Sequence, residues 1–449
     1  MKPWMRALTA PAIASLALAG CGGGSQFVTS DAALSQLSKT GAGKIKHIVF
    51  IVQENRSFNN LFMGYPGAET VTKGKISNGT VVKLQPVGLA DQYVIDHSAE
   101  SMFAACNGTG STPGTDCRMN GFNNEPNWGG PRGVQYPEYV YAPRKDTQPY
   151  WDMAHEWVVA DHMFQSHLDE SFVSHQYIIA AQAGSSVDLP YGMWGCPGGK
   201  SDQVPVISHN RDIGGYETPC WDYTTLGDEL DQAGLSWKFY TSKYGSPSSG
   251  DGSWWSSYQA VNHIYNGPDW KTDIITPQKQ FLKDVPAGKL ANFTWITPIC
   301  SDSDHVNCGG GFGPSWVAAI VNAVGNSKFW DSTAIFVMWD DWGGLYDPVK
   351  PPFEDYDGLG FRVPLLVISP YAKKDYVSHV QYETASVLRF AEDLWGLKQM
   401  AAADKRANSP AGDCFDFTQS PRKFVKIKAP KYGSFFLTQP TEYRAPDYE

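Results

Sequence analysis

Two short polar segments of the sequence combine the residue types that bind a hard divalent cation. Glu54 and Asn55 follow one apolar run of the chain, and Asp340 and Asp341 follow another. If both runs are strands of an open α/β sheet, these side chains lie at the carboxyl ends, where such sheets bind ligands. Their carboxylate and amide oxygens suit a divalent ion, which would neutralise a phosphate group and polarise a phosphoryl oxygen. The competing interpretation is a helix cap at the first segment and a solvated turn at the second.

A serine ahead of a predicted helix is the candidate nucleophile. Ser171 lies in the segment Asp169–Tyr177, which leads into an apolar helix predicted over 175–183. The start of a helix presents free N–H groups and the positive end of the helix dipole, and both favour an anion. Ser174 is better placed as the N-cap, which leaves Ser171 available for chemistry. The competing interpretation is that Ser171 is an ordinary N-cap.

Two histidines stand in predicted loops with acidic and hydroxyl neighbours. His97 follows Asp96, and His305 follows Asp304. Either imidazole could bind phosphate oxygens or act as a general acid. A lone loop histidine is more often a bystander, so spacing alone does not assign either of them a role.

The elements that must position these residues alternate between strands and helices. Apolar, β-branched runs predict strands buried on both faces, at 47–52, 333–339 and 363–369, with weaker candidates at 237–241 and 293–297. Helical patterns lie between them, at 175–183, 314–324 and 382–397. This alternation predicts an α/β fold with a mostly parallel central sheet and helices on both faces.

Long segments rich in Gly, Pro and Asn are expected to form loops over the site. They span 105–150, 185–222 and 243–258, and loops of this length are commonly functional. Trp254 and Trp255 in the third segment could hold a choline-like head group by cation–π contact. The competing interpretation is that they are buried aromatic residues under a loop.

The bulk composition is that of a globular protein. The chain has 449 residues, of which 42% are hydrophobic and 18% charged, with a net charge of −10. That net charge argues against a nucleic-acid backbone as the main partner. We find no internal repeat, and we expect one catalytic domain over 45–400 with a tail, 401–449, that packs on the same domain.

The N-terminus predicts export and lipid anchoring. Lys2 and Arg6 flank a short apolar run that is too short to span a bilayer, so residues 1–20 are interpreted as a signal peptide. Leu18–Cys21 resembles a bacterial lipobox, which would make Cys21 a lipidated residue on the outer side of the cell envelope. Residues 21–44 would then be a lipidated linker. The alternative is ordinary secretion.

Seven further cysteines predict structural disulfides rather than a zinc site. Their spacings lack the paired C-x-x-C pattern, and export permits disulfides. Pairing of nearest neighbours predicts three bonds and leaves Cys414 over, with the pairs Cys106–Cys117, Cys196–Cys220 and Cys300–Cys308.

A series of motifs resembles, in order, the bacterial phosphoesterase family of phospholipases C and acid phosphatases. The resemblance covers about residues 45 to 417. It rests on the segments His47–Phe58, Asp96–Ser98, Met119–Phe122, Ala160–Phe164, Asp169–His175, Asp340–Asp347, Gly360–Pro364 and Ile368–Tyr371.

The resemblance implies the three-layer α/β/α sandwich of the alkaline-phosphatase superfamily and a role for each candidate residue. One divalent metal ion of unknown identity would be held by four side chains, which are Glu54, Asn55, Asp340 and Asp341. Ser171 would be the nucleophile and a further metal contact, and His97 and His305 would touch the phosphoryl group. The implied chemistry is in-line attack on phosphorus through a phosphoseryl intermediate.

The sequence departs from the family pattern at two places. Asp169-Glu170 stands where the family has Gly-Pro, which adds two carboxylates beside a site for an anion. The segment Asp347–Pro352 lacks the histidine that the family usually has there. Asp340-Asp341 is the pair found in the acid phosphatases, whereas phospholipases C typically have Asp-Glu.

Three functions are therefore compared. The favoured one is a metal-dependent hydrolase of phosphoric esters, acting on phospholipid head groups or on smaller monoesters. The second is a lipid-anchored surface protein that keeps the fold and binds without catalysis. The third is a metal-free serine esterase, against which stands the absence of a Gly-x-Ser-x-Gly elbow.

Overall fold

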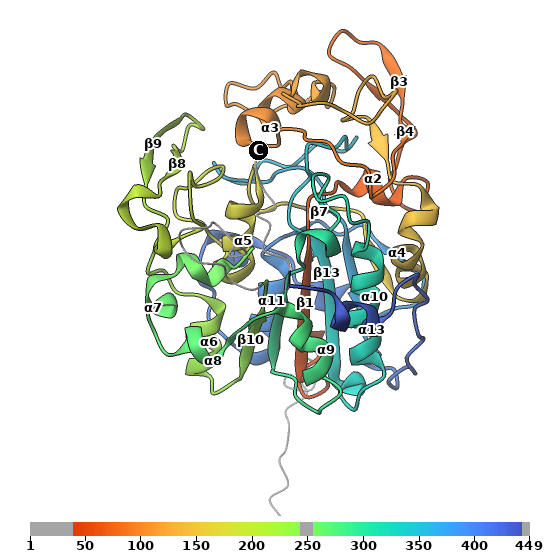
Figure 1. The fold of residues 1–449 in the computed structure, drawn as a ribbon, viewed down its shortest axis with the longest axis vertical. Coiled ribbons are helices and arrows are strands. Elements are labelled where there is room, and N and C mark those ends of the chain that lie inside the picture. The colour runs from red at the N-terminus through yellow and green to blue at the C-terminus, as the bar shows by residue number, and fades with distance from the viewer. Residues whose placement is uncertain (1–38, 243–254, 442–449) are drawn as a thin grey trace, which may run out of the picture.

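The centre of the protein is one eight-stranded sheet (Figure 1). The computed structural model describes residues 39–242 and 255–441. In spatial order the strands are β11 (Ile274–Ile275), β10 (Trp237–Tyr240), β12 (Phe293–Ile296), β1 (His47–Gln53), β13 (Thr333–Trp339), β14 (Leu365–Ile368), β6 (Val158–Ala160) and β15 (Tyr376–Ser378). Neighbours are parallel except at β14, which is antiparallel to both β13 and β6. The predicted mostly parallel α/β sheet is confirmed.

Helices cover both faces of this sheet and complete the three layers (Figure 1). One group packs around α10 and consists of α4 (Arg144–Glu156), α9 (Phe281–Asp284), α10 (Gly313–Gly325) and α13 (Gly433–Thr438). The other group packs around α5 and α11 and consists of α5 (Ser171–Ala180), α6 (Leu226–Gln232), α11 (Ser386–Trp395) and α12 (Ala402–Arg406).

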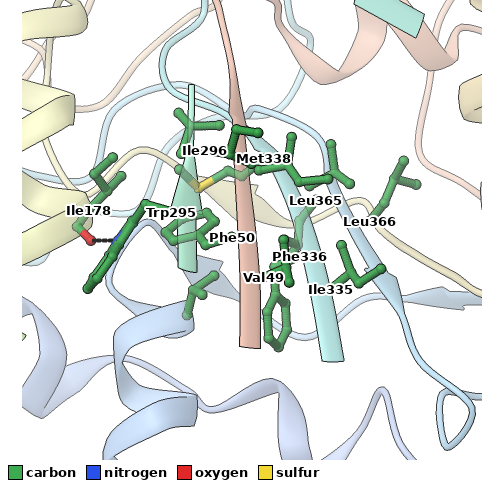
Figure 2. Packing of buried hydrophobic residues seen from close by; sticks show 14 of the residues in the cluster. Val49, Phe50, Ile178, Trp295, Ile296, Ile335, Phe336, Met338, Leu365 and Leu366 are labelled. Atoms are coloured by element: carbon green, nitrogen blue, oxygen red, sulfur yellow. Dashed lines mark hydrogen bonds between the residues drawn. The ribbon is translucent and has the colours of Figure 1, made fainter. Parts of the chain in front are cut away.

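The apolar runs form the core of the sheet because both of their faces are covered. The five residues from Ile48 to Val52 in β1 are 0% exposed, as is every residue of β12 that faces a helix layer, such as Trp295. Figure 2 shows Phe50, Phe336 and Ile296 packed among neighbouring strands. Each such side chain contributes about 1.5–3 kcal/mol by its burial. The Trp295 indole donates to the Ile178 carbonyl at 2.9 Å, which ties α5 to the sheet.

Irregular segments lie beyond the carboxyl ends of the strands (Figure 1). They carry short elements, namely α2 (Phe58–Phe62), β2 (Lys73–Lys75), β3 (Val81–Lys83), β4 (Gln85–Pro86), α3 (Ala99–Cys106), β5 (Val140–Tyr141), β7 (Met163–Phe164), β8 (Val204–Ile207), β9 (Ile213–Glu217) and β16 (Tyr382–Glu383). The predicted disulfides are confirmed as Cys106–Cys117, Cys196–Cys220 and Cys300–Cys308, and Cys414 is a buried free cysteine.

The remaining helices are short. They are α7 (Asn262–Tyr265) and α8 (Asp269–Thr272), together with the 3-10 turns Phe122–Asn124, Cys196–Ser201, Ser257–Ala260, Gln278–Gln280, Cys300–Asp302, Trp330–Ser332 and Pro410–Gly412. Within the described residues, no helix is both long and apolar enough to cross a membrane.

One predicted helix begins later than expected. The pattern predicts a helix over 382–397, but Tyr382–Glu383 forms β16, which pairs with β7, and α11 begins at Ser386. The Ser386 hydroxyl accepts the Glu383 N–H at 3.0 Å. That side-chain bond competes with helical pairing and holds the preceding residues extended.

The C-terminal segment and the N-terminal segment stand differently. Residues beyond 400 contribute Phe415, Ile427 and Phe436 to the same core as the sheet. The predicted signal peptide, Cys21 and all of the linker up to residue 38 lie outside the described residues, as does Trp254.

Arg362 forms a buried ion pair that joins three loops at the carboxyl edge. Its Nε and Nη2 donate to Asp347 at 2.8 and 3.1 Å, and its Nη1 donates to the Asp161 carbonyl at 2.6 Å. Its guanidinium lies 4.9 Å from the centre of the Phe58 ring. The pair accounts for the arginine in the Gly360–Pro364 motif.

We predict that Arg362→Met lowers the free energy of unfolding by about 3–5 kcal/mol, because it leaves the Asp347 carboxylate buried without its cation. The control is Arg389→Met, which removes a partly exposed i,i+4 pair with Asp393 and should cost no more than about 1 kcal/mol. Denaturant unfolding measures both. Equal losses in the two variants would contradict the assignment.

Glu392 predicts a pH dependence of stability. Burial, followed by the nearby Asp404 carboxylate, raises the pKa of Glu392 from 4.5 to about 9. The folded state therefore holds a proton that the unfolded state releases, so this group's contribution to stability is lost as pH rises from about 4.5 towards 9. Glu392→Gln should flatten the fall in Tm between pH 5 and 9, whereas the exposed-site control Glu354→Gln should not. An unchanged slope in Glu392→Gln would refute the prediction.

Candidate active site

The two polar segments meet because β1 and β13 are parallel neighbours. Their register pairs Gln53 with Trp339, so the next residues of both strands leave the sheet side by side. The Asn55 N–H donates to Asp340 Oδ1 at 2.9 Å. Gly343 is required at this crossing, because its φ is +62° and a Cβ there would meet the Asn55 carbonyl at 2.3 Å.

The Asn55 side chain is the hub of the site. Its Nδ2 lies 2.7 Å from Asp341 Oδ2, 3.0 Å from Ser171 Oγ and 3.0 Å from His97 Nε2. One amide therefore joins the ends of β1 and β13, the start of α5 and the loop before α3. The backbone of Asn55 is left-handed, with φ of 54°, a conformation that asparagine tolerates better than most residues.

Ser171 is the first residue of α5. Its hydroxyl lies 3.1 Å from Asp341 Oδ2, to which it donates, and 3.4 Å from Glu54 Oε2. The prediction that Ser174 caps this helix is wrong: the N-cap is Glu170, and Ser174 lies inside the first turn, where its hydroxyl donates to the Asp340 carbonyl at 2.9 Å. The helix starts earlier because this bond holds its first turn against the end of β13.

The additional carboxylate at Asp169 is directed away from this hydroxyl. Asp169 Oδ1 lies 3.4 Å from His167 Nδ1, and its Oδ2 accepts the Asp188 N–H at 2.5 Å. Burial raises the pKa of Asp169 to about 7. The departure from the family pattern therefore adds less negative charge at Ser171 than two ionised carboxylates would.

Glu54, His175 and Asp340 form a buried group with the geometry of a metal site. Each offers a ligand atom, and these atoms lie within 4.8 Å of one another. His175 Nε2 is 3.1 Å from Glu54 Oε1 and 3.8 Å from Asp340 Oδ2. Burial opposes ionisation of Asp340, but the charge of His175 and hydrogen bonds from neighbours, among them the Asn55 N–H, hold its pKa below the ordinary value.

The donor set fits a cation. Asn55 Oδ1 and Asp340 Oδ2 are buried and have no hydrogen-bond partner in the described part of the chain, and buried oxygens of this kind ordinarily have one. The structure brings together all four residues expected as ligands. Asp341 is directed towards Asn55 and Ser171, and His175 joins the group instead.

Sequence reasoning did not select His175 as a ligand. It lies four residues after Ser171 on α5, and residues at this spacing share one face of a helix. That spacing from a candidate nucleophile was the signal available in the sequence.

His97 presents one nitrogen to the site. Its Nδ1 lies 3.0 Å from the Ile95 carbonyl, which can only accept, so Nδ1 carries a proton. Nε2, which faces Asn55 and lies 3.7 Å from Asp341 Oδ2, is an acceptor in the neutral ring. His97 can donate to a phosphoryl oxygen through Nε2 only when the ring is protonated.

His305 has the opposite arrangement. Its Nδ1 accepts the Asn307 N–H at 3.1 Å, so Nε2 carries the proton of the neutral ring. The ring centre lies 6.4 Å from that of His97 and 6.2 Å from that of Trp255. Trp255 is 1% exposed, which agrees with the interpretation of a buried aromatic residue under a loop.

The loop that carries His305 is held at several points. The Cys300–Cys308 disulfide closes it. The adjacent Asp304 carboxylate accepts the Tyr150 hydroxyl at 2.7 Å and the Trp339 indole N–H at 3.0 Å. Because Trp339 is the last residue of β13, the loop is fixed relative to the acidic segment that follows that strand.

Fold and site together define an α/β protein in which a buried serine and an acidic cluster share the carboxyl edge of the sheet. The chain belongs to the phosphoesterase family, whose model matches residues 45–398. The family expected from the sequence motifs is therefore confirmed.

Curated relatives of the chain are phospholipases C. It is 24% identical over 405 residues to the non-hemolytic phospholipase C of Burkholderia pseudomallei, covering 78% of this chain and 55% of that protein. It is 26% identical over 403 residues to the hemolytic phospholipase C of Pseudomonas aeruginosa, covering 79% and 53%. For phospholipase C A of Mycobacterium tuberculosis the values are 24%, 79% and 73%. The chain thus spans about half the length of the first two relatives.

Solved structures resemble it more distantly. A protein of the alkaline phosphatase superfamily from Vibrio parahaemolyticus aligns with 84% of this chain and 71% of its own, at 10% identity and a TM-score of 0.37. A phosphonate monoester hydrolase from Silicibacter pomeroyi aligns with 62% and 73%, at 13% identity and a TM-score of 0.32.

We predict that the chelator-treated chain binds one divalent cation and that His175→Gln and Glu54→Gln each weaken binding at least about tenfold, because each removes a ligand. Titration calorimetry with Mn²⁺, Zn²⁺, Mg²⁺ and Ca²⁺ measures this. Glu392→Gln, which removes a buried carboxylate on α11, is the control and should bind as the parent does. Equal affinity in all four proteins would count against this group as the site.

Proposed function

We propose that this protein is a metal-dependent hydrolase of phosphoric esters that acts through Ser171. The observation that carries the proposal is the Ser171 hydroxyl at the start of α5, 3.1 Å from Asp341 Oδ2 and 3.0 Å from Asn55 Nδ2. Membership of the phosphoesterase family and the phospholipase C relatives support the same reaction class.

Ser171 is the nucleophile of the proposed reaction. Its proton passes to the Asp341 carboxylate as Oγ bonds to phosphorus, and the bond between phosphorus and the leaving oxygen breaks. The Asn55 amide holds both partners in place, since it contacts Asp341 and Ser171. N–H groups in the first turn of α5 are directed at the position where the phosphoryl oxygens gather charge. Water then hydrolyses the phosphoseryl ester and restores the serine.

Glu54, His175 and Asp340 would hold the metal ion, with Asn55 Oδ1 directed at the same place. When bound, the ion supplies positive charge that neutralises the phosphate and activates the serine oxygen. The rest of the acidic group then needs no further counter-charge from the protein.

His305 is the better placed proton donor for the leaving group. Its Nε2 carries the proton of the neutral ring, whereas that of His97 does not. We assign His305 as the general acid and His97 as a contact to the phosphoryl group in its protonated form.

The substrate class follows from the relatives and the predicted anchor. The relatives are phospholipases C, and a lipidated Cys21 would hold the domain at a membrane of the cell envelope. A phosphodiester of a lipid head group is therefore the first substrate to test. The Asp340-Asp341 pair favours a monoester, so both classes belong in the same assay.

The experiment is hydrolysis of p-nitrophenyl phosphorylcholine and p-nitrophenyl phosphate by the full chain, from acid to neutral pH, with and without chelator. We expect Ser171→Ala and Asp340→Asn to lower kcat at least about a thousandfold, because one removes the nucleophile and the other a metal ligand. The matched control is Ser186→Ala, a buried serine beyond the other end of α5 that bonds only to the Ala183 carbonyl at 2.6 Å.

The outcomes separate the alternatives. Turnover that survives the chelator would favour a metal-free serine esterase. No turnover of either ester, with divalent ions resupplied, would favour a surface protein that binds without catalysis. The better substrate of the two distinguishes a phosphodiesterase from a phosphomonoesterase.

A further inference from the structure

The β2–β3 hairpin displays an unusual face to solvent. In its antiparallel register Lys73 is opposite Lys83 and Lys75 is opposite Val81. Because side chains alternate along a strand, these four share one face, and all four are exposed. We call this set the lysine face.

The lysine face carries uncompensated charge in an acidic protein. The net charge of the chain is −10, yet no Asp or Glu occurs between Glu69 and Asp91. Within the part of the chain that the structure describes, none of the three lysines forms an ion pair. Like charges directly opposite in a two-stranded hairpin destabilise it, so the Lys73–Lys83 pair has a cost that an anionic partner would offset.

The other face of the hairpin is seated rigidly on the body of the protein. Gly74 lies against Tyr139 and Tyr346, and a Cβ at this position would meet the two rings at 2.7 and 2.8 Å. The Tyr139 hydroxyl also donates to the Lys75 carbonyl at 2.7 Å. Tyr346 follows the Asp340-Asp341 segment closely, and its carbonyl accepts the Ser57 hydroxyl at 3.0 Å. The hairpin is thus fixed to both segments of the candidate active site.

The hairpin lies at the same end of the molecule as the site. Figure 1 shows β3 and β4 beyond the carboxyl ends of β1 and β13, whereas α8 and α9 lie at the opposite end. Val81 is 55% exposed, so the face combines three ammonium groups with one apolar side chain. That combination suits an interface between charged head groups and acyl chains.

We propose that the lysine face docks the protein on an anionic phospholipid bilayer and turns the carboxyl edge of the sheet towards the lipid. The docking is a binding property that requires no turnover, so it stands or falls apart from the proposed catalysis. Each lysine near an anionic surface contributes about 1 kcal/mol, which corresponds to about fivefold in partitioning.

The test is co-sedimentation of the full chain with vesicles. Cys21→Ser is included throughout, so that no acyl chain at that position contributes. Vesicles of phosphatidylcholine alone are compared with vesicles containing phosphatidylglycerol, at low and high salt. We expect binding to the anionic vesicles only, weakened by salt, and about a hundredfold lower in the triple variant Lys73→Gln, Lys75→Gln, Lys83→Gln.

Two further proteins separate binding from folding. Lys83→Glu places opposite charges across the strand pair, so it should keep or raise Tm while lowering vesicle binding. The control, Lys271→Gln, Lys283→Gln, Lys289→Gln, removes three lysines near α8, α9 and the turn that follows, at the opposite end, and should bind as the parent does. Binding that is equal on both vesicles, or equally affected by the control, would overturn the proposal.

Two more arms make the result specific. A single-stranded oligonucleotide that binds the lysine face more tightly than the anionic vesicles do would overturn the proposal in favour of another polyanion. Turnover of the soluble ester p-nitrophenyl phosphorylcholine is measured on the same samples. Turnover without vesicle binding would refute docking and leave the hydrolase proposal standing, and vesicle binding without turnover would do the reverse.

Discussion

The parallel pairing of β1 with β13 is the constraint on which the rest of the molecule depends. The register that places Gln53 beside Trp339 brings residues almost three hundred positions apart in the chain to one edge. Burial of both strands on both faces fixes that register, because neither strand has a polar face that could tolerate a shift. The polar residues that follow therefore meet without having to attract one another.

The meeting of so many carboxylates away from water would by itself be unfavourable. Buried charges persist only when they are paired or hydrogen-bonded. Here the Asn55 amide and the His175 ring supply part of the compensation, and they belong to the same elements that supply the acids. The same edge also receives the Arg362–Asp347 pair, which holds the surrounding loops. The site is thus built into the packing of the sheet rather than placed on a mobile loop.

The sequence was most informative where one physical effect dominated. The apolar runs predict β1 and β13 because continuous burial leaves a pattern that few other effects can imitate, and the polar residues at their ends could be found for the same reason. Local spacing was enough for the three disulfides. The sequence was less informative where a tertiary contact overrode a local preference. Ser174 looks like an N-cap until its hydroxyl is seen to bond to the Asp340 carbonyl.

Other features were beyond pattern reasoning because they depend on distance in space. The antiparallel direction of β14 leaves no mark in an apolar run that is buried on both faces. His175 resembles any helical histidine until Glu54 is placed beside it. The tautomers of His97 and His305 depend on which backbone group lies next to each ring, and those groups lie in irregular loops.

The distribution of the cysteines has a consequence for how an exported chain of this kind matures. Each disulfide joins residues close in sequence, with separations of 8, 11 and 24. Each partner therefore emerges soon after the other during translocation, and correct pairing requires no order among the three bonds. Cys414 emerges long after them, and in the folded protein burial raises the pKa of its thiol to about 12. Once the C-terminal segment has packed, that thiol stays protonated and shielded, so the finished protein cannot reshuffle its own disulfides through it.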